Sequence, residues 1–316
     1  MFRPYAHARY EVFFMRLLLA VVVLFSVDHM LPNLIGEPSG TPGIAQMSKM
    51  PYPTGVGHIF PWLTILSNES VAWWTHLALA VGLFLYVCGL VLPLSLALVT
   101  AIHIAIFTLN NSQGATHHGY QLISVVLLAQ CVVAWLPWGF RIFGKKLVLP
   151  DGLHLRDWSV YYSQLAIAGC YVIAGVTKML ASGPMWIVKS PLIAVQIHKS
   201  FDQKYYEYLD PKWLEEGHQY ADFAVQNPNL ARLILGGGLI LELIAFLVLV
   251  GRRSAAILGV SLIAMHLAIG YTMALHFPEN ERIDFVFLVN APFWIVTAFA
   301  WITAKRKGSL PLESGS

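Results

Sequence analysis

Eight stretches of this chain are apolar for long enough to cross a lipid bilayer, and this property restricts the possible folds more than any other. A crossing helix needs roughly 17 to 25 mostly apolar residues. The stretches cover residues 12–31, 71–91, 93–110, 118–138, 159–180, 231–250, 254–275 and 284–303. The sequence therefore predicts an all-α polytopic membrane protein, a bundle of about eight transmembrane helices.

The composition agrees with this class of protein. Hydrophobic residues make up 57% of the chain and charged residues only 12%, with a mean hydropathy of +0.63. A soluble domain has about a quarter charged residues, so most of this surface is expected to face lipid. The net charge of +3 is too small to indicate a nucleic-acid partner. We therefore expect membrane lipids, and no nucleic acid, as partners.

The basic residues of the loops orient the bundle. If eight helices alternate in direction, one side receives Arg3, Arg9, Arg141, Lys145, Lys146, Arg156, Arg252, Arg253, Lys305, Arg306 and Lys307. The other side receives the long segments 28–70 and 181–229. By the positive-inside rule, both termini are then cytoplasmic. We expect one transmembrane domain over 1–316, with 28–70 and 181–229 as outer segments, in a bacterial inner membrane or its equivalent. A re-entrant helix at 56–67 would change the number of crossings.

Several ionisable residues are expected within or at the ends of the spans, and none lies close to the basic loops. They are His29, His76, His103, His117, His118, Lys178, Glu242, His266 and His276. An ionisable group at membrane depth is costly, which makes it a candidate for function. Each also has a structural alternative, because a histidine can form an interhelical hydrogen bond and a lysine can reach the interface.

The cysteines and histidines do not form a recognisable redox or metal motif. Cys88, Cys131 and Cys170 include no CxxC pair, which disfavours thiol–disulfide exchange. Neighbouring histidine side chains on a helix diverge by about 100°, so the His117–His118 pair does not present two ligands to one ion. We predict no metal. A mixed site assembled from His103, His118 and His266 stays open as an alternative.

One segment resembles a known family. Tyr171-Val-Ile-Ala-Gly-Val-Thr-Lys178-Met-Leu, followed by Trp186, is similar to the Y-x-x-A-G-x-x-K-[LM]…W segment of the HTTM (horizontally transferred transmembrane) family. This family includes the membrane domain of vitamin K-dependent gamma-carboxylases. Further stretches agree in order with the family motifs F-R-x-x-x-G, N-N-H-x-Y, G-G-G-L-L-L-D and F-H. They are Phe14-Met-Arg16, Asn110-Asn111 with His118-Gly-Tyr120, Gly236-Gly-Gly238-Leu-Ile-Leu-Glu242, and Met265-His266.

The resemblance implies a function for these positions. Lys178 matches the base that deprotonates a reduced quinone (vitamin K hydroquinone), and His118 matches a residue that supports this base. The residues implied to line the cofactor site are His117, Tyr120, Trp186, Glu242 and His266. The chemistry implied is carboxylation or epoxidation driven by a reduced quinone, O2 and CO2, on an unknown substrate at the outer or lumenal face. Burial disfavours the charged form of a lysine, which suits a base for a phenol-like hydroxyl.

Two departures leave other functions open. Thr177 stands where the carboxylases have a second lysine, and the chain ends at Ser316 without their large extramembrane domain. A peptide or protein substrate would then have to be held by 28–70 or 181–229, although 181–229 also fits an interfacial amphipathic helix. The alternatives are a non-catalytic quinone- or lipid-binding module and a small-molecule or proton transporter. A transporter requires polar residues that continue to the cytoplasmic face, and the expected inner halves of the spans contain few ionisable residues.

Overall fold

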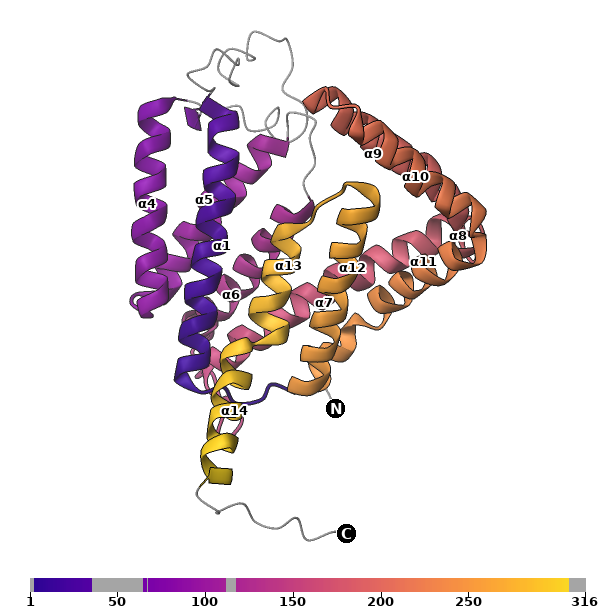
Figure 1. The fold of residues 1–316 in the computed structure, drawn as a ribbon. Coiled ribbons are helices and arrows are strands. Elements are labelled where there is room, and N and C mark those ends of the chain that lie inside the picture. Colours follow the sequence, from indigo (N-terminus) through magenta and orange to yellow (C-terminus); the bar gives the residue numbers. More distant parts are fainter. Residues whose placement is uncertain (1–2, 36–64, 67, 112–117, 307–316) are drawn as a thin grey trace, which may run out of the picture.

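The computed structural model describes residues 3–35, 65–66, 68–111 and 118–306. Every regular element in these ranges is a helix (Figure 1). The first part contains α1 (Arg9–Ile35), α4 (Glu69–Cys88), α5 (Leu92–Asn111), α6 (His118–Ile142) and α7 (Leu155–Ser182). The second part contains α8 (Met185–Val188), η2 (Ser190–Leu192), α9 (Ile193–Tyr208), α10 (Lys212–Gln226), α11 (Pro228–Leu243), η3 (Ala245–Val250), α12 (Arg252–Met273), α13 (Pro278–Asp284), η4 (Phe285–Val289) and α14 (Ala291–Arg306).

Six of these helices are long and apolar enough to cross a membrane, and a bent pair brings the number up to seven within the described residues. The six lie in α1, α4, α5, α6, α7 and α12. The bent pair joins Pro278–Val289 to Ala291–Thr303 at an angle of 42°. By helix length and hydropathy, the chain is thus a multi-pass integral membrane protein, as the sequence predicts.

One expected span differs from the structure. The stretch 231–250 is divided between α11 and the 3-10 helix η3. With 16 residues, α11 is shorter than the roughly 17 residues that a straight crossing helix needs. The stretch 284–303 falls within the bent pair, which starts earlier, at Pro278. The expected re-entrant helix at 56–67 and most of the outer segment 28–70 lie outside the described residues.

The turns between helices follow from local chemistry. Asn68 caps α4, and its side-chain oxygen accepts a hydrogen bond from the Val71 N–H at 3.2 Å. Gly89 ends α4 with φ of 71°, a left-handed conformation that favours glycine. Asn290 takes φ of 51° between η4 and α14, which coincides with the 42° bend there.

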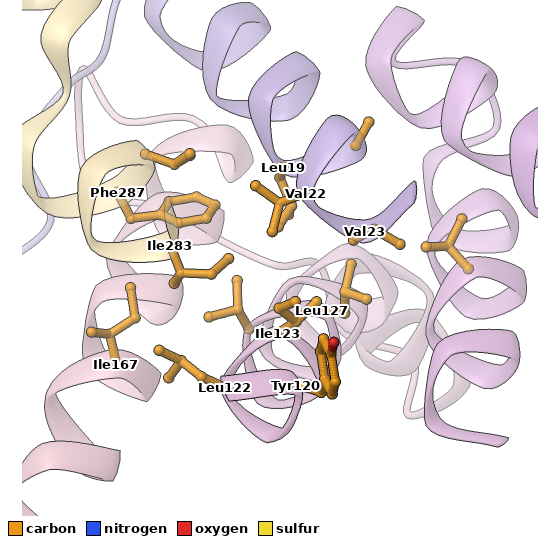
Figure 2. Close-up of a cluster of buried hydrophobic side chains, with 14 of the residues drawn as sticks. Leu19, Val22, Val23, Tyr120, Leu122, Ile123, Leu127, Ile167, Ile283 and Phe287 are labelled. Atoms are coloured by element: carbon orange, nitrogen blue, oxygen red, sulfur yellow. The ribbon is translucent and has the colours of Figure 1, made fainter. Parts of the chain in front are cut away.

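The main apolar core joins helices that are far apart in the sequence. Figure 2 shows α1 side chains meeting those of α6, α7, α13 and η4, represented by Leu19, Ile123, Ile167, Ile283 and Phe287. Phe287 and Ile283 are 1% and 0% exposed. This core packs α12 against α13 and η4, and α7 against η4, which positions the polar residues described below.

A second, smaller core lies under the hairpin formed by α9 and α10. Its buried residues are Ala194, Ile197, Phe201, Ala221, Ala224, Met273 and Ala274. Met273 is the last residue of α12 and Ala274 follows it, so the hairpin packs its apolar face onto the bundle at the end of that helix. Segment 181–229 therefore contains amphipathic helices packed on the bundle, the simpler of the two interpretations of its sequence.

Candidate functional site

Lys178, near the end of α7, pairs with Glu242 of α11. The Lys178 ammonium donates to both carboxylate oxygens, with Nζ 2.5 Å from Oε1 and 2.7 Å from Oε2. The Glu242 side chain is 9% exposed and that of Lys178 is 36% exposed. Lys178 therefore has a specific and nearly buried partner, unlike a lysine that only reaches the membrane interface.

Gly175 allows this pair to form because it lets α11 approach α7 closely. A Cβ atom at Gly175 would lie 3.0 Å from Leu243 Cδ2 and 3.3 Å from Glu242 Cβ. Gly175 lies one turn before Lys178 on the same helix. The glycine of the sequence motif thus has a packing reason, which is to bring the Glu242 side chain within reach of Lys178.

Trp186 of α8 lies beside the pair. Lys178 Nζ is 5.5 Å from the centroid of the Trp186 ring, which is within cation–π range. The next residue, Ile187, packs on α11, where a Cβ atom at Gly236 would lie 3.5 Å from Ile187 Cγ2. Three of the expected site residues, from α7, α8 and α11, are therefore in contact.

His266 of α12 joins this group from the neighbouring helix. It is 6% exposed, and its ring centroid lies 5.7 Å from that of Tyr171 and 5.4 Å from that of Phe277. It also lies within electrostatic range of the Lys178 ammonium. Its Nδ1 atom is buried and has no hydrogen-bond partner among the described residues. A buried ring nitrogen of this kind is a ready contact for a ligand or a water molecule.

Tyr171 and Asp284 form a buried pair that the sequence analysis missed. The Tyr171 hydroxyl donates to Asp284 Oδ2 at 2.7 Å, and Asp284 is 0% exposed. The second oxygen, Oδ1, has no partner in the described part of the chain. Asp284 is the first residue of the expected span 284–303. An acidic residue at the start of an apolar stretch was therefore the sequence feature that could have indicated this pair. Tyr171 stood within the motif around Lys178, but nothing in the sequence indicated its partner.

The expected residues at the start of α6 are only partly described. His117 and the side chain of His118 lie outside the described residues. Tyr120 is 3% exposed in the core between α1 and α6 (Figure 2), with its ring centroid 6.4 Å from that of His29. Beside it, a Cβ atom at Gly119 would lie 2.9 Å from Glu279 Oε2, so the Glu279 carboxylate packs directly on the first turn of α6.

His103 links three helices through hydrogen bonds of its ring. Its Nε2 atom lies 3.1 Å from Ser26 Oγ, and its Nδ1 atom lies 2.9 Å from Ser124 Oγ, at 0% exposure. Both ring nitrogens are thus engaged in a link between α1, α5 and α6, so they are not available to the mixed site with His118 and His266. Among the described residues, no group of three His, Cys, Asp or Glu side chains is arranged to hold a metal ion.

A polar cluster at the start of α1 and α12 was also missed. Arg252 pairs with Glu11 and donates to the Ala6 carbonyl, and the Glu11 carboxylate accepts a hydrogen bond from Asn290 Nδ2 at 2.8 Å. The Arg252 guanidinium lies 5.0 Å from the Tyr5 ring centroid. We call the end of the bundle at which α1, α7 and α12 begin the Arg252 end. From the sequence, Arg252 served only to orient the loops, because its partner Glu11 lies more than two hundred residues away along the chain.

No protein-family model, no curated protein and no solved structure matches this chain. The likeness to the HTTM family therefore rests on the short motifs given above. Among the described residues, the side chains best placed for chemistry are Lys178, Glu242, Trp186 and His266.

Proposed function

We propose that the protein is a membrane enzyme in which the Lys178–Glu242 pair accepts a proton from the phenolic hydroxyl of a reduced quinone. The observation that carries the proposal is the two-fold hydrogen bond of this pair beside the Trp186 ring. The reaction type is the one implied by the resemblance, a carboxylation or epoxidation that uses O2 and CO2 on an unknown substrate.

The pair can accept a proton although an ammonium by itself cannot. As ammonium and carboxylate, Lys178 and Glu242 carry no net charge together. Glu242 accepts a proton directly, or Lys178 passes one of its protons to Glu242 and accepts the new one. Both routes end with an ammonium beside a carboxylic acid, and this positive charge stabilises a neighbouring phenolate. Glu242 thus supplies the proton acceptor that an ammonium by itself lacks.

The surrounding residues fit a reduced quinone. When bound, such a molecule supplies a phenolic proton and two electrons for the reduction of O2. The Trp186 ring offers a flat apolar face for an aromatic ring, and the unpartnered His266 Nδ1 offers a polar contact for an oxygen atom. His117, His118 and Tyr120 belong to this proposal through the resemblance alone.

We place this site on the outer or lumenal side of a bacterial inner membrane or its equivalent, with both termini cytoplasmic. This orientation requires eight crossings, so α11 and η3 together act as one crossing in addition to the bent pair. It is supported by the position of Arg9 and Arg252 at the start of α1 and α12, and by the start of both helices at the end where α14 finishes (Figure 1). We treat residues 1–316 as a single domain, as predicted from the sequence.

A peptide or protein substrate would meet the α9–α10 hairpin of the outer segment 181–229. The end of α9 and the following residue expose Tyr206, Tyr208 and Leu209, at 76%, 59% and 71%. Exposed aromatic residues of this kind are common in surfaces that bind other chains.

The test is oxidation of added vitamin K hydroquinone by the purified protein under air, followed as formation of quinone or epoxide. Lys178→Met and Glu242→Gln should each lower the rate by at least tenfold, because each removes one half of the proton-accepting pair. The exposed Lys189, which follows α8, provides a matched control, and Lys189→Met should leave the rate unchanged.

Two other results would replace this proposal. Equal rates for the wild-type protein and both pair variants would exclude the pair as the base. Saturable quinone binding without any oxidation would instead indicate a non-catalytic quinone- or lipid-binding module, the alternative drawn from the same residues.

A further inference from the structure

Helix α7 carries four polar side chains at intervals of seven residues, namely Asp157, Gln164, Tyr171 and Lys178. Seven residues are almost two helical turns, so successive members drift by only about 20° and share one face of the helix. Asp157, Gln164 and Tyr171 are 0%, 2% and 5% exposed. We call these four residues the polar stripe of α7. It extends over nearly the whole of a helix that is long and apolar enough to cross a membrane.

The stripe begins at the Arg252 end, where it meets the N-terminal segment. The backbone N–H of His7 donates to Asp157 Oδ1 at 2.8 Å, and the ring atom Nδ1 of His7 lies 3.6 Å from the same oxygen. The rings of His7 and Tyr5 are 4.8 Å apart, and the Tyr5 hydroxyl accepts a hydrogen bond from Gln164 Nε2 at 3.2 Å. The first two members of the stripe are therefore connected through polar groups of the segment before α1.

In the middle, the stripe meets an irregular piece of helix. Gln164 Nε2 also donates to the Phe287 carbonyl at 2.9 Å. Phe287 lies in η4, a π-helical turn, which shifts the backbone hydrogen bonds and frequently marks a functional position. Asp284 immediately precedes this turn and accepts a hydrogen bond from the Tyr171 hydroxyl. The turn η4 therefore connects Gln164, the second member of the stripe, to Tyr171, the third.

At the other end, Tyr171 contacts the ring of His266, which lies within electrostatic range of Lys178. Lys178 is paired with Glu242, so every member of the stripe has a polar or ionisable partner on another element. The ionisable groups beside the stripe are Glu242 on α11, Asp284 on α13, and the Glu11–Arg252 pair that joins α1 to α12. Polar residues thus continue to the Arg252 end, because α7 begins at Leu155 and includes the polar turn before the expected span 159–180.

Several atoms along this route are buried and lack a hydrogen-bond partner in the part of the chain that the structure describes. They are His7 Nδ1 and Nε2, Gln164 Oε1, His266 Nδ1, Asp284 Oδ1 and Asn290 Oδ1. A stripe that served only to hold helices together would be expected to satisfy its own polar atoms. Groups of this kind in protein interiors are usually bridged by buried water molecules.

We propose that the polar stripe of α7, with its partners, conducts protons between the Lys178–Glu242 pair and the Arg252 end of the bundle through bridging water. In each step, one O–H or N–H bond breaks and another forms on the next atom. No electrons move, and the net result is the passage of one proton. This activity is separate from quinol oxidation and does not depend on it.

The test uses the full-length protein reconstituted into liposomes that contain a pH-sensitive dye. A potassium gradient with valinomycin imposes a membrane potential, and the internal pH is followed without any quinone. The wild-type protein should change the internal pH at least tenfold faster than liposomes without protein. Gln164→Leu should remove this excess rate, because an apolar side chain interrupts the middle of the stripe.

Three further variants separate conduction from loss of fold. Tyr171→Phe removes only one hydroxyl and should also slow the flux, whereas Gln164→Glu keeps a group that can exchange protons and should preserve it. Gln130 is a matched control, since it is 3% exposed and bonded to Tyr86 and Ser163 but lies outside the stripe. Gln130→Leu should leave the flux of the correctly folded fraction unchanged.

Two results would overturn the proposal. One is a wild-type flux no greater than that of liposomes without protein. The other is an undiminished flux in folded Gln164→Leu and Tyr171→Phe proteins. Because no quinone is present, neither result bears on the proposed oxidation at the Lys178–Glu242 pair.

Discussion

The Lys178 ammonium donates hydrogen bonds to both carboxylate oxygens of Glu242, at 2.5 and 2.7 Å, and thereby ties α7 to α11. Glu242→Leu should lower the free energy of unfolding by about 2 kcal/mol, because the ammonium loses charge-assisted hydrogen bonds. The double variant Lys178→Met/Glu242→Leu should recover part of this loss, since no unpaired charge remains. Denaturant unfolding in detergent, analysed as a double-mutant cycle, measures the coupling.

The exposed pair of Lys204 and Glu207 is the control for this cycle, because it has similar chemistry within a single helix at 2.8 Å. Glu207→Leu should produce no measurable change in stability, as is usual for exposed ion pairs. A coupling for Lys178 and Glu242 as small as that of the exposed pair would contradict the assignment of a structured, functional pair.

Tyr171→Phe should destabilise the protein by about 1 to 3 kcal/mol, because the buried Asp284 carboxylate loses the hydrogen bond that it accepts from the Tyr171 hydroxyl at 2.7 Å. The ring contact with His266 is kept in this variant, so the loss reports the hydrogen bond alone. Thermal unfolding in detergent is the measurement. Tyr161→Phe is a control on the same helix, and a loss of equal size there would show that the effect is not specific to Asp284.

Arg252→Met should cost about 3 to 5 kcal/mol, because the Glu11 carboxylate is 2% exposed and would be left without its cation. Arg252→Lys should recover only part of this loss. A lysine lacks the planar fork with which Arg252 reaches both the carboxylate and the Ala6 carbonyl. Equal stability of the lysine variant and the wild-type protein in denaturant unfolding would refute this explanation.

Gly217→Ala should loosen the α9–α10 hairpin, because a Cβ atom at Gly217 would lie 2.6 Å from Phe201 Cβ. Overpacking of this kind typically costs about 1 to 3 kcal/mol. Faster amide hydrogen exchange in residues 193–226 would report it. Gly237→Ala is the control, since nothing lies within 4 Å of the added atom and alanine favours a helix.

The stability of the Arg252 end should depend on pH through His7. Burial, and then the nearby Arg252 charge, lowers the pKa of His7 from its ordinary value of 6.5 to about 4. Below pH 6.5 the unfolded chain therefore binds a proton at His7 that the folded chain does not bind, and unfolding becomes easier as the pH falls to about 4. Above pH 6.5 this contribution to stability is fully present.

The variant His7→Asn isolates this effect from the titration of carboxylates. The stability of the wild-type protein, measured relative to the variant, should decline between pH 6.5 and about 4 and then become constant. Unfolding curves of the two proteins that keep the same separation over this range would argue against a neutral, buried His7.

Much of the fold was predictable because it depends on local composition. Long apolar stretches predict helices that cross a membrane, and six of the eight expected stretches correspond to such helices in the described residues. The stretch 231–250 was predicted as one span, and its apolar composition does not show the change from α11 to η3. The end of α7 was predicted well, but its start was placed too late because Leu155–Trp158 is polar enough to resemble a loop.

The sequence by itself determined the membrane class and the seven-residue spacing of Asp157, Gln164, Tyr171 and Lys178, and it indicated Lys178 as a candidate for function. Only the tertiary structure decided which partners those side chains meet. Glu242 and Asp284 lie 64 and 113 residues from Lys178 and Tyr171 respectively, and no local pattern encodes such distances. The physical reason is that burial makes a polar group depend on a specific partner, and that partner is set by the packing of whole helices.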